Sequence, residues 1–81
     1  MINKLQAILE DPLREHTNLT ANEREAGRLA SLAFLNHEIA DTMNISEYHV
    51  GWLLREIAKK TNMKKNELAK NMIRQIEELV K

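Results

Sequence analysis

Apolar residues recur every three or four positions along most of the chain, which is the spacing of one face of an α-helix. Glycine occurs twice and proline once, and the β-branched and aromatic residues are too scattered to mark strands. The pattern therefore predicts an all-helical protein. The expected helices cover about residues 2–10, 21–33, 36–43, 47–60 and 66–80.

Short polar motifs mark the ends of these helices. Thr20 and Glu23 match a capping box, in which the threonine hydroxyl and the glutamate carboxylate each accept a hydrogen bond from a backbone N–H. Ser46 is the expected N-cap of the helix that follows it. Asn44 and Asn62 are expected to end helices, because asparagine tolerates the positive φ that glycine usually adopts there.

The apolar stripes of the central helices predict the core. In the helix over 21–33, the buried side is expected to hold Ala26, Leu29, Ala30, Leu32 and Ala33, and the solvent side Glu23, Arg24, Glu25 and Arg28. The next two helices are expected to bury Ile39, Ala40, Met43, Val50, Leu53, Leu54, Ile57 and Ala58. The last helix has an apolar face wider than one neighbouring helix needs.

The charge balance excludes a uniformly basic surface, since 12 Lys and Arg residues are matched by 12 Asp and Glu residues. Residues 1–56 nevertheless carry five basic and nine acidic side chains, and residues 57–81 carry seven basic and three acidic ones. One end of the chain is therefore positive enough to meet phosphate. Without cysteine no disulfide framework forms. No apolar stretch suits a membrane span or a signal peptide, so we expect a cytoplasmic protein without membrane contact.

Residues 36–60 have the pattern of a helix-turn-helix, two helices joined by a tight turn. Apolar residues stand at the spacing that packs the two helices together: Ile39, Ala40, Ile45, Val50 and Leu54. Around this unit the chain resembles the LuxR/GerE-type DNA-binding domain. The resemblance rests on Leu-Thr-Ala-Asn-Glu-Arg-Glu at 19–25, Asn-His-Glu-Ile-Ala at 36–40, Asn-Ile-Ser-Glu at 44–47, His-Val at 49–50 and Lys-Thr-Asn-Met at 60–63. These stretches follow the family's order and separations over about residues 19–75.

The resemblance implies both a fold and a function. The implied fold is a four-helix LuxR/GerE-like helix-turn-helix module over residues 19–81, preceded by a short N-terminal helix and linker over residues 1–18. In the family the third helix of the module enters the major groove and the fourth pairs two copies. The implied function is that of a stand-alone, bacterial-type transcription regulator at the nucleoid, binding double-stranded DNA as a homodimer. Recognition would lie on about residues 46–60 and dimerisation on residues 66–80.

Individual site residues follow from this alignment and from the helix positions. The expected DNA-binding residues are Asn36, His37, Ser46, Tyr48, His49, Gly51, Trp52, Arg55, Lys59, Lys64 and Lys65. The expected dimer-interface residues are Leu68, Met72, Ile76 and Leu79. The recognition helix departs from the family pattern, because it lacks the usual early lysines. Gly51 also lies within that helix, where glycine costs about 1 kcal/mol relative to alanine.

Three features have a second interpretation. Trp52 either projects as an aromatic anchor for a partner or folds back onto the first helix. The basic residues either meet DNA or form an ordinary solvated face. The apolar face of the last helix either pairs with a second copy or is covered within the chain by Leu5, Ile8 and Leu9.

Two other classes of function follow from these alternatives and from the chemistry of the side chains. The first is a helix-turn-helix that has lost DNA binding and regulates another protein through Tyr48, Trp52, Leu53 or the last helix. The second is catalysis, which has little support, because His16, His37 and His49 are far apart and no cysteine ligand or glycine-rich phosphate loop is present. Ser46 and His49 are explained by helix capping. We therefore expect no enzyme, metal or cofactor.

Overall fold

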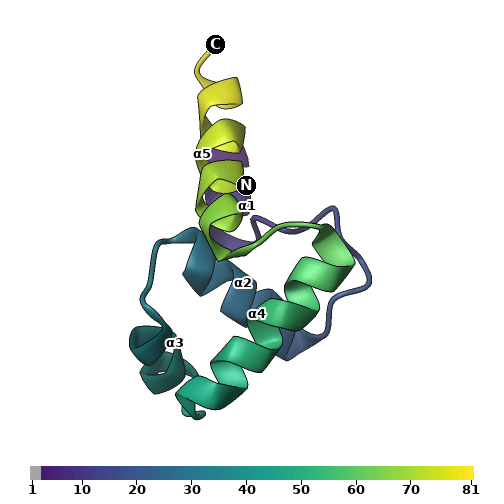
Figure 1. Ribbon diagram of the computed structural model, residues 1–81. Coiled ribbons are helices and arrows are strands. Elements are labelled where there is room, and N and C mark those ends of the chain that lie inside the picture. Colours follow the sequence, from purple (N-terminus) through teal and green to yellow (C-terminus); the bar gives the residue numbers. More distant parts are fainter. Residues whose placement is uncertain (1–2) are drawn as a thin grey trace.

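Every regular element of the computed structural model is an α-helix over residues 3–81, the part of the chain that it describes (Figure 1). The helices are α1 Lys4–Glu10, α2 Ala21–Ser31, α3 Asn36–Met43, α4 Glu47–Thr61 and α5 Lys65–Leu79. The prediction of an all-helical chain with five helices is confirmed. Ile2, expected in the first helix, lies outside the described residues. Within them, no helix has the length and apolar character that crossing a membrane requires.

The predicted helix caps are present. The Glu23 backbone N–H donates to Thr20 Oγ1 over 3.1 Å, and the Thr20 N–H donates to Glu23 Oε1 over 2.9 Å. Ser46 Oγ accepts from the His49 N–H over 3.0 Å. Asn44 and Asn62 have φ of 58° and 61° at the ends of α3 and α4, as the sequence predicts. These local signals fix where the helix-turn-helix begins, turns and ends.

The end of α2 differs from the prediction. Ala33 has a φ of 69°, and the Phe34 N–H donates to the Leu29 carbonyl over 3.1 Å. This is a Schellman motif, which closes the helix at Ser31 and turns the chain outward. The prediction that Leu32 and Ala33 are buried is therefore wrong, and both side chains are exposed. Alanine gives no sequence signal for this turn, because glycine or asparagine normally occupies the left-handed position.

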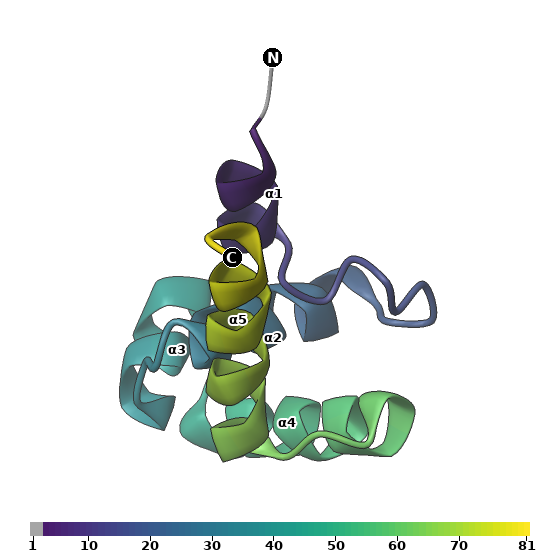
Figure 2. The same ribbon diagram turned by 90° about the horizontal axis from the view of Figure 1, so that it is seen from above.

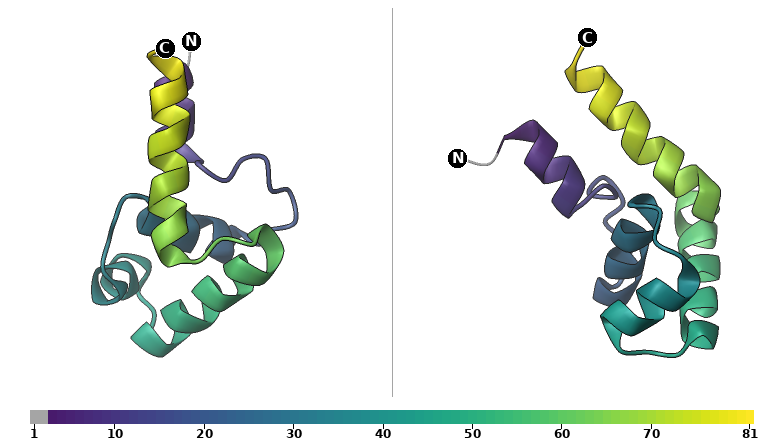
Figure 3. Two further views of the ribbon diagram at one scale, coloured as in Figure 1. Left: turned by 45° about the horizontal axis from the view of Figure 1, so that its top comes forward. Right: turned by 90° about the vertical axis from the view of Figure 1, so that its left-hand side faces the viewer.

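Helix α2 lies at the centre of the molecule and packs against α3, α4 and α5, while α1 packs on α5. Figure 2 shows α5 lying across α2, with α4 at the edge of the molecule opposite α1. Helices α1 and α5 run beside each other at the other end (Figure 3). The core is formed by buried residues of all these elements: Leu13, Leu19, Ala26, Leu29, Ala30, Ile39, Ala40, Val50, Leu53, Ile57 and Leu68.

The segment between α1 and α2 belongs to this core. Leu13 is 1% exposed, and a Cβ on Gly27 of α2 would lie only 2.5 Å from its Cδ1 atom, so glycine permits the close approach. The Arg24 guanidinium holds the segment in place by donating to the Asp11 carboxylate and to the carbonyls of Leu13 and His16. These contacts tie residues 11–16, part of the expected linker, to α2.

Glu23 is buried, contrary to the prediction that it faces solvent. Only 2% of the residue is exposed, because the end of α4 packs over the start of α2. Lys60 Nζ donates to Glu23 Oε1 over 2.7 Å, and this bond joins the first turn of α2 to the last turn of α4. The residue is thus an N-terminal cap and one half of an ion pair.

Candidate nucleic-acid interface

Helices α3 and α4 are joined by a tight turn, as the pattern over residues 36–60 predicts, and both pack against α2. Ile39 on α3 and Val50, Leu53 and Ile57 on α4 are at most 2% exposed, so the inner faces of both helices are fully packed. The corner between them is closed by Asn44, after which the Ile45 N–H donates to the Ala40 carbonyl over 3.0 Å. Among the described residues, one face of α4 stays largely uncovered.

This outer face of α4 combines two aromatic and two basic side chains: Tyr48, Trp52, Arg55 and Lys59. The positions are three, four, seven or eleven apart and therefore share one side of the helix. All four side chains are exposed, Tyr48 by 81% and Trp52 by 46%. The alternative that Trp52 folds back onto the first helix does not occur. Its ring instead lies 6.1 Å from that of His49, centroid to centroid, at an angle of 49°.

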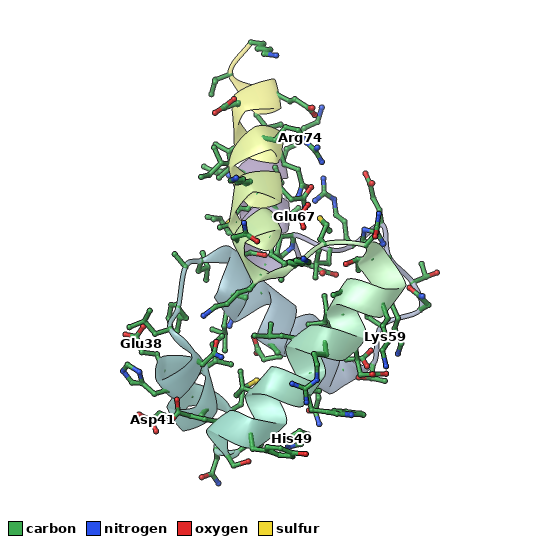
Figure 4. The ribbon with its side chains drawn as sticks, in the orientation of Figure 1. Glu38, Asp41, His49, Lys59, Glu67 and Arg74 are labelled. Carbon is green, nitrogen blue, oxygen red and sulfur yellow. The ribbon has the colours of Figure 1, made fainter. Side chains whose placement is uncertain are left out.

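The basic residues near this face have different surroundings. Lys59 Nζ lies 3.0 Å from Glu56 Oε2 at the exposed end of α4, where Lys59 is labelled in Figure 4. Among the described residues no carboxylate forms an ion pair with Arg55. Lys60, next in the sequence, turns inward to Glu23. Arg55 is thus the cation of the outer face that is most free to bind an incoming anion.

Gly51 leaves a smooth patch beside these side chains. A Cβ at this position would meet only Arg55 Nη1, at an ordinary contact distance of 3.7 Å. No contact with residues 3–81 therefore requires a glycine here, although glycine destabilises the middle of a helix. Close approach of a binding partner to α4 would explain why glycine occupies position 51.

The expected phosphate contacts gather at the start of α3. Lys65 Nζ, on the first residue of α5, donates to Asn36 Oδ1 over 2.7 Å, and so brings together two predicted site residues that are 29 positions apart. His37 and Lys64 are exposed close to them in the sequence. Glu38 lies at the same helix end and accepts from the Leu35 N–H over 2.8 Å. Its carboxylate lowers the attraction of the α3 N-terminus for anions, so the lysines must supply it.

The start of α5 is capped in the same way, because Glu67 Oε1 accepts a hydrogen bond from the Lys64 N–H over 3.0 Å. Neither Glu38 nor Glu67 was predicted as a capping residue, because neither follows a Ser or Thr at the N-cap. A glutamate three residues after the last extended residue is the signal that identifies them. Each helix start thereby carries one carboxylate close to the exposed lysines.

The structure changes the expected dimer contact. Leu68 and Met72 are 1% and 4% exposed, because α5 packs on α2 and α1, so both lie inside the chain and cannot face a second copy. Ile76 is half-buried, and Leu79 is 37% exposed. The most exposed apolar side chains at this end are Ile73 of α5, 54% exposed, and Val80, the C-cap residue that follows the helix, 81% exposed.

The interpretation that Leu5, Ile8 and Leu9 cover the last helix holds in part. Ile8 is 1% exposed, while Leu5 and Leu9 remain 44% and 38% exposed. Leu53, suggested as a contact for another protein, is 2% exposed and belongs to the core. The described residues also hold no group of three His, Cys, Asp or Glu side chains placed to bind a metal ion.

No model of a known protein family, no curated protein and no solved structure matches this chain. Over residues 3–81 the regular structure is entirely helical, with a tight two-helix corner and one exposed helix face of mixed aromatic and basic character.

Proposed function

We propose that this protein is a LuxR/GerE-like transcription regulator that binds double-stranded DNA with α4 in the major groove. The observation that carries the proposal is the outer face of α4, which exposes Tyr48, Trp52, Arg55 and Lys59 while the opposite face is anchored in the core. The major groove admits one α-helix, and a rigidly held helix can present side chains to base edges.

Each side chain of this face has a role in that complex. Arg55 is placed to donate two hydrogen bonds to a guanine edge, and Lys59 to meet phosphate. Tyr48 and His49 donate hydrogen bonds, and Trp52 offers apolar contact to a thymine methyl group. Ser46 and Gly51 let the start of α4 approach the groove closely, while Asn36, His37, Lys64 and Lys65 meet the phosphate backbone.

A net charge of zero is compatible with this proposal. The positive charge is concentrated in residues 57–81, and the acidic excess lies in residues 1–56. The cations at Lys59, Lys64 and Lys65 can therefore attract phosphate without a basic total.

Duplex DNA titrated at several salt concentrations tests the proposal. We expect the logarithm of the association constant to fall linearly with the logarithm of salt concentration, by about 0.9 for each phosphate contacted. Arg55→Glu with Lys59→Glu should abolish binding. Lys4→Glu with Lys70→Glu changes the net charge equally at exposed positions off this face, and should retain most of the affinity.

No binding of any duplex at low salt would contradict the proposal. Equal losses in both double variants would show that only total charge matters. Either result would favour the second candidate function, that of a helix-turn-helix that binds and regulates another protein. Its specific support is the exposure of Tyr48 and Trp52, since tyrosine, tryptophan and arginine dominate protein interfaces.

The proposed homodimer would use the exposed apolar residues at the α1 and α5 end. Ile73 on α5 and Val80, the C-cap residue of that helix, are seven apart and lie toward one side of it, and Leu5 and Leu9 share one side of α1. Helices α1 and α5 pack together, which places the four residues at the same end of the molecule (Figure 3).

Ile73→Glu with Val80→Glu is expected to give a folded monomer, because two carboxylates on an apolar contact cannot be buried without partners. Sedimentation measures the mass, and circular dichroism checks the fold. Tyr48→Glu, on the outer face of α4, serves as the control and should leave the dimer intact. A double variant that still sediments as a dimer would place the interface elsewhere.

A further inference from the structure

Two apolar hollows lie on either side of the start of α5. The first has a volume of about 430 Å³ and is lined by Leu54 and Ala58 of α4, with Arg55, Lys59, Lys64 and Lys65 around it. The second, of about 480 Å³, is lined by Ala30, Ala33, Phe34, Leu35 and Ala69, again with Lys64 and Lys65 and also Asn66. The two lysines therefore separate two apolar depressions.

The loop before α3 keeps the second hollow open. Ala33 holds a left-handed backbone conformation, with φ of 69°, although glycine or asparagine adopts it at lower cost. As a result Leu35 is 56% exposed and Phe34 is only partly covered. A strained alanine that leaves a leucine in water is a feature that a partner surface would explain.

The charges around the hollows favour an acidic partner. Four cations surround the first hollow, and two of them also border the second. Glu56 compensates Lys59, and the Glu67 carboxylate is engaged with the backbone N–H of Lys64. Arg55 and the Lys64 ammonium have no carboxylate partner among the described residues. Carboxylates of a partner could therefore form ion pairs with the Arg55 guanidinium and the Lys64 ammonium, both of which lie beside an apolar surface.

We propose that this surface, from Leu54 and Ala58 across Lys64 and Lys65 to Leu35, binds an acidic amphipathic helix of another protein. Two apolar side chains one turn apart on that helix would enter the two hollows, and carboxylates between and beside them would meet the lysines. DNA is a poorer occupant, since phosphates gain nothing from an apolar floor and the residues of the second hollow do not belong to the outer face of α4. The site goes beyond the proposed DNA binding: it shares its lysines and Arg55 with the proposed DNA interface, and it adds the apolar residues of the two hollows, which a protein partner would contact.

A synthetic peptide tests this surface directly. The probe is a helical peptide of about 14 residues with two leucines four positions apart and glutamates around them. Two matched peptides replace the leucines by serine or the glutamates by lysine. Each is titrated into the ¹⁵N-labelled full chain, and amide shifts are followed by NMR. We expect the leucine–glutamate peptide to shift the amides of Leu35, Ala58 and Ala69, and neither matched peptide to do so.

Substitutions in the two hollows provide a second test of the proposed peptide site. Leu35→Ser and Ala58→Glu should each lower the affinity for the peptide by about tenfold or more, which corresponds to about 1.4 kcal/mol. Leu35 is exposed and Ala58 half-buried on the surface of α4, so both variants should fold. Val80→Ser and Lys70→Glu are the matched controls away from the hollows and should bind the peptide normally. The Leu35→Ser variant should bind duplex DNA as tightly as the unchanged protein.

Three results would overturn the proposal. The first is no shift with the leucine–glutamate peptide, and the second is an equal shift with the serine peptide, which would indicate charge attraction alone. The third is a duplex DNA that shifts Leu35 and Ala69 as strongly as the peptide does, which would assign the surface to nucleic acid. Failure of DNA binding with normal peptide binding would contradict only the proposed function.

Discussion

Replacing Glu23 by alanine is expected to lower the free energy of unfolding by about 2–4 kcal/mol, through loss of a cap and of a buried ion pair. The carboxylate accepts from the Thr20 N–H and from Lys60 Nζ, and the residue is 2% exposed. Without it, the helix start of α2 and the Lys60 ammonium both lose their partner. The side chain of Lys60 is 29% exposed and can turn to water, which places the loss below that of a fully buried pair.

Thermal and urea unfolding measure the loss, and each kcal/mol corresponds to about 4–8 °C in Tm for a domain of this size. Glu25→Ala is the control, because Glu25 is only an exposed partner of Arg28 on the same helix and should change the stability by less than about 0.5 kcal/mol. Glu23→Gln keeps an acceptor for the Thr20 N–H and should fall between the two. Equal stability of the Glu23→Ala and Glu25→Ala variants would show that the buried pair contributes nothing.

The same pair gives the stability a pH dependence. Burial raises the pKa of Glu23, but the Lys60 ammonium and the Thr20 N–H and hydroxyl lower it more, so the pKa lies below the ordinary value of a glutamate. A carboxyl whose pKa is depressed by folding contributes its stability above the unfolded pKa of about 4.3 and loses it as the pH falls through the folded value. Urea midpoints measured from pH 7 to pH 3 should fall less steeply for Glu23→Gln than for the unchanged protein.

Replacing Ile57 by alanine is expected to have an effect at least as large, with about 2–5 kcal/mol lost to transfer and cavity terms. Ile57 is completely buried on α4, and its Cδ1 atom lies close to Gly27 of α2, 3.6 Å from the position of a Cβ there. Since small domains have about 5–15 kcal/mol of stability in total, a substantial fraction of the variant should unfold on mild heating.

Circular dichroism at increasing temperature measures this loss. The matched control is Tyr48→Ala on the same helix, which removes a side chain that is 81% exposed and should leave Tm unchanged. The two variants also separate stability from binding, because Tyr48→Ala is expected to weaken DNA binding while the protein stays folded. A stable Ile57→Ala variant would mean that the core around α4 is looser than its burial indicates.

Most of the secondary structure could be predicted because its signals are local. Thr20 and Glu23 are three residues apart, and Ser46 caps through the N–H of His49, also three residues away. Asn44 and Asn62 mark their turns by their own conformational preference. The one misplaced helix end is that of α2, where Ala33 adopts the left-handed conformation without any preference for it.

Burial was harder to predict, because periodicity shows which side of a helix is apolar and not what covers it. Leu68 and Met72 stand on the broad apolar face of α5, and only the packing on α2 and α1 reveals that they are internal. For Glu23 a different expectation failed: a glutamate in the first turn of a helix normally faces water, but this one is buried. Its burial depends on Lys60, which is 37 positions away.

The candidate site could be predicted only in outline. The position of the helix-turn-helix and the exposure of Tyr48 and Arg55 follow from helix geometry. The bond between Lys65 and Asn36, and the two apolar hollows beside it, depend on how the start of α5 lies against α3 and α4. Contacts between elements that are distant in the chain leave no pattern in a single sequence.

Trp52 is the single tryptophan of the chain, and it stands half-exposed on the outer face of α4 beside the ring of His49. Its indole emission therefore comes entirely from the surface that we propose to enter the groove, and no fluorescent label is needed to observe that surface. An aromatic ring that stacks on bases or becomes shielded from water changes its emission, whereas a ligand held in the second hollow, away from α4, leaves it largely alone. The molecule thus carries an intrinsic optical reporter of contacts along α4, to which a ligand confined to the second hollow contributes little.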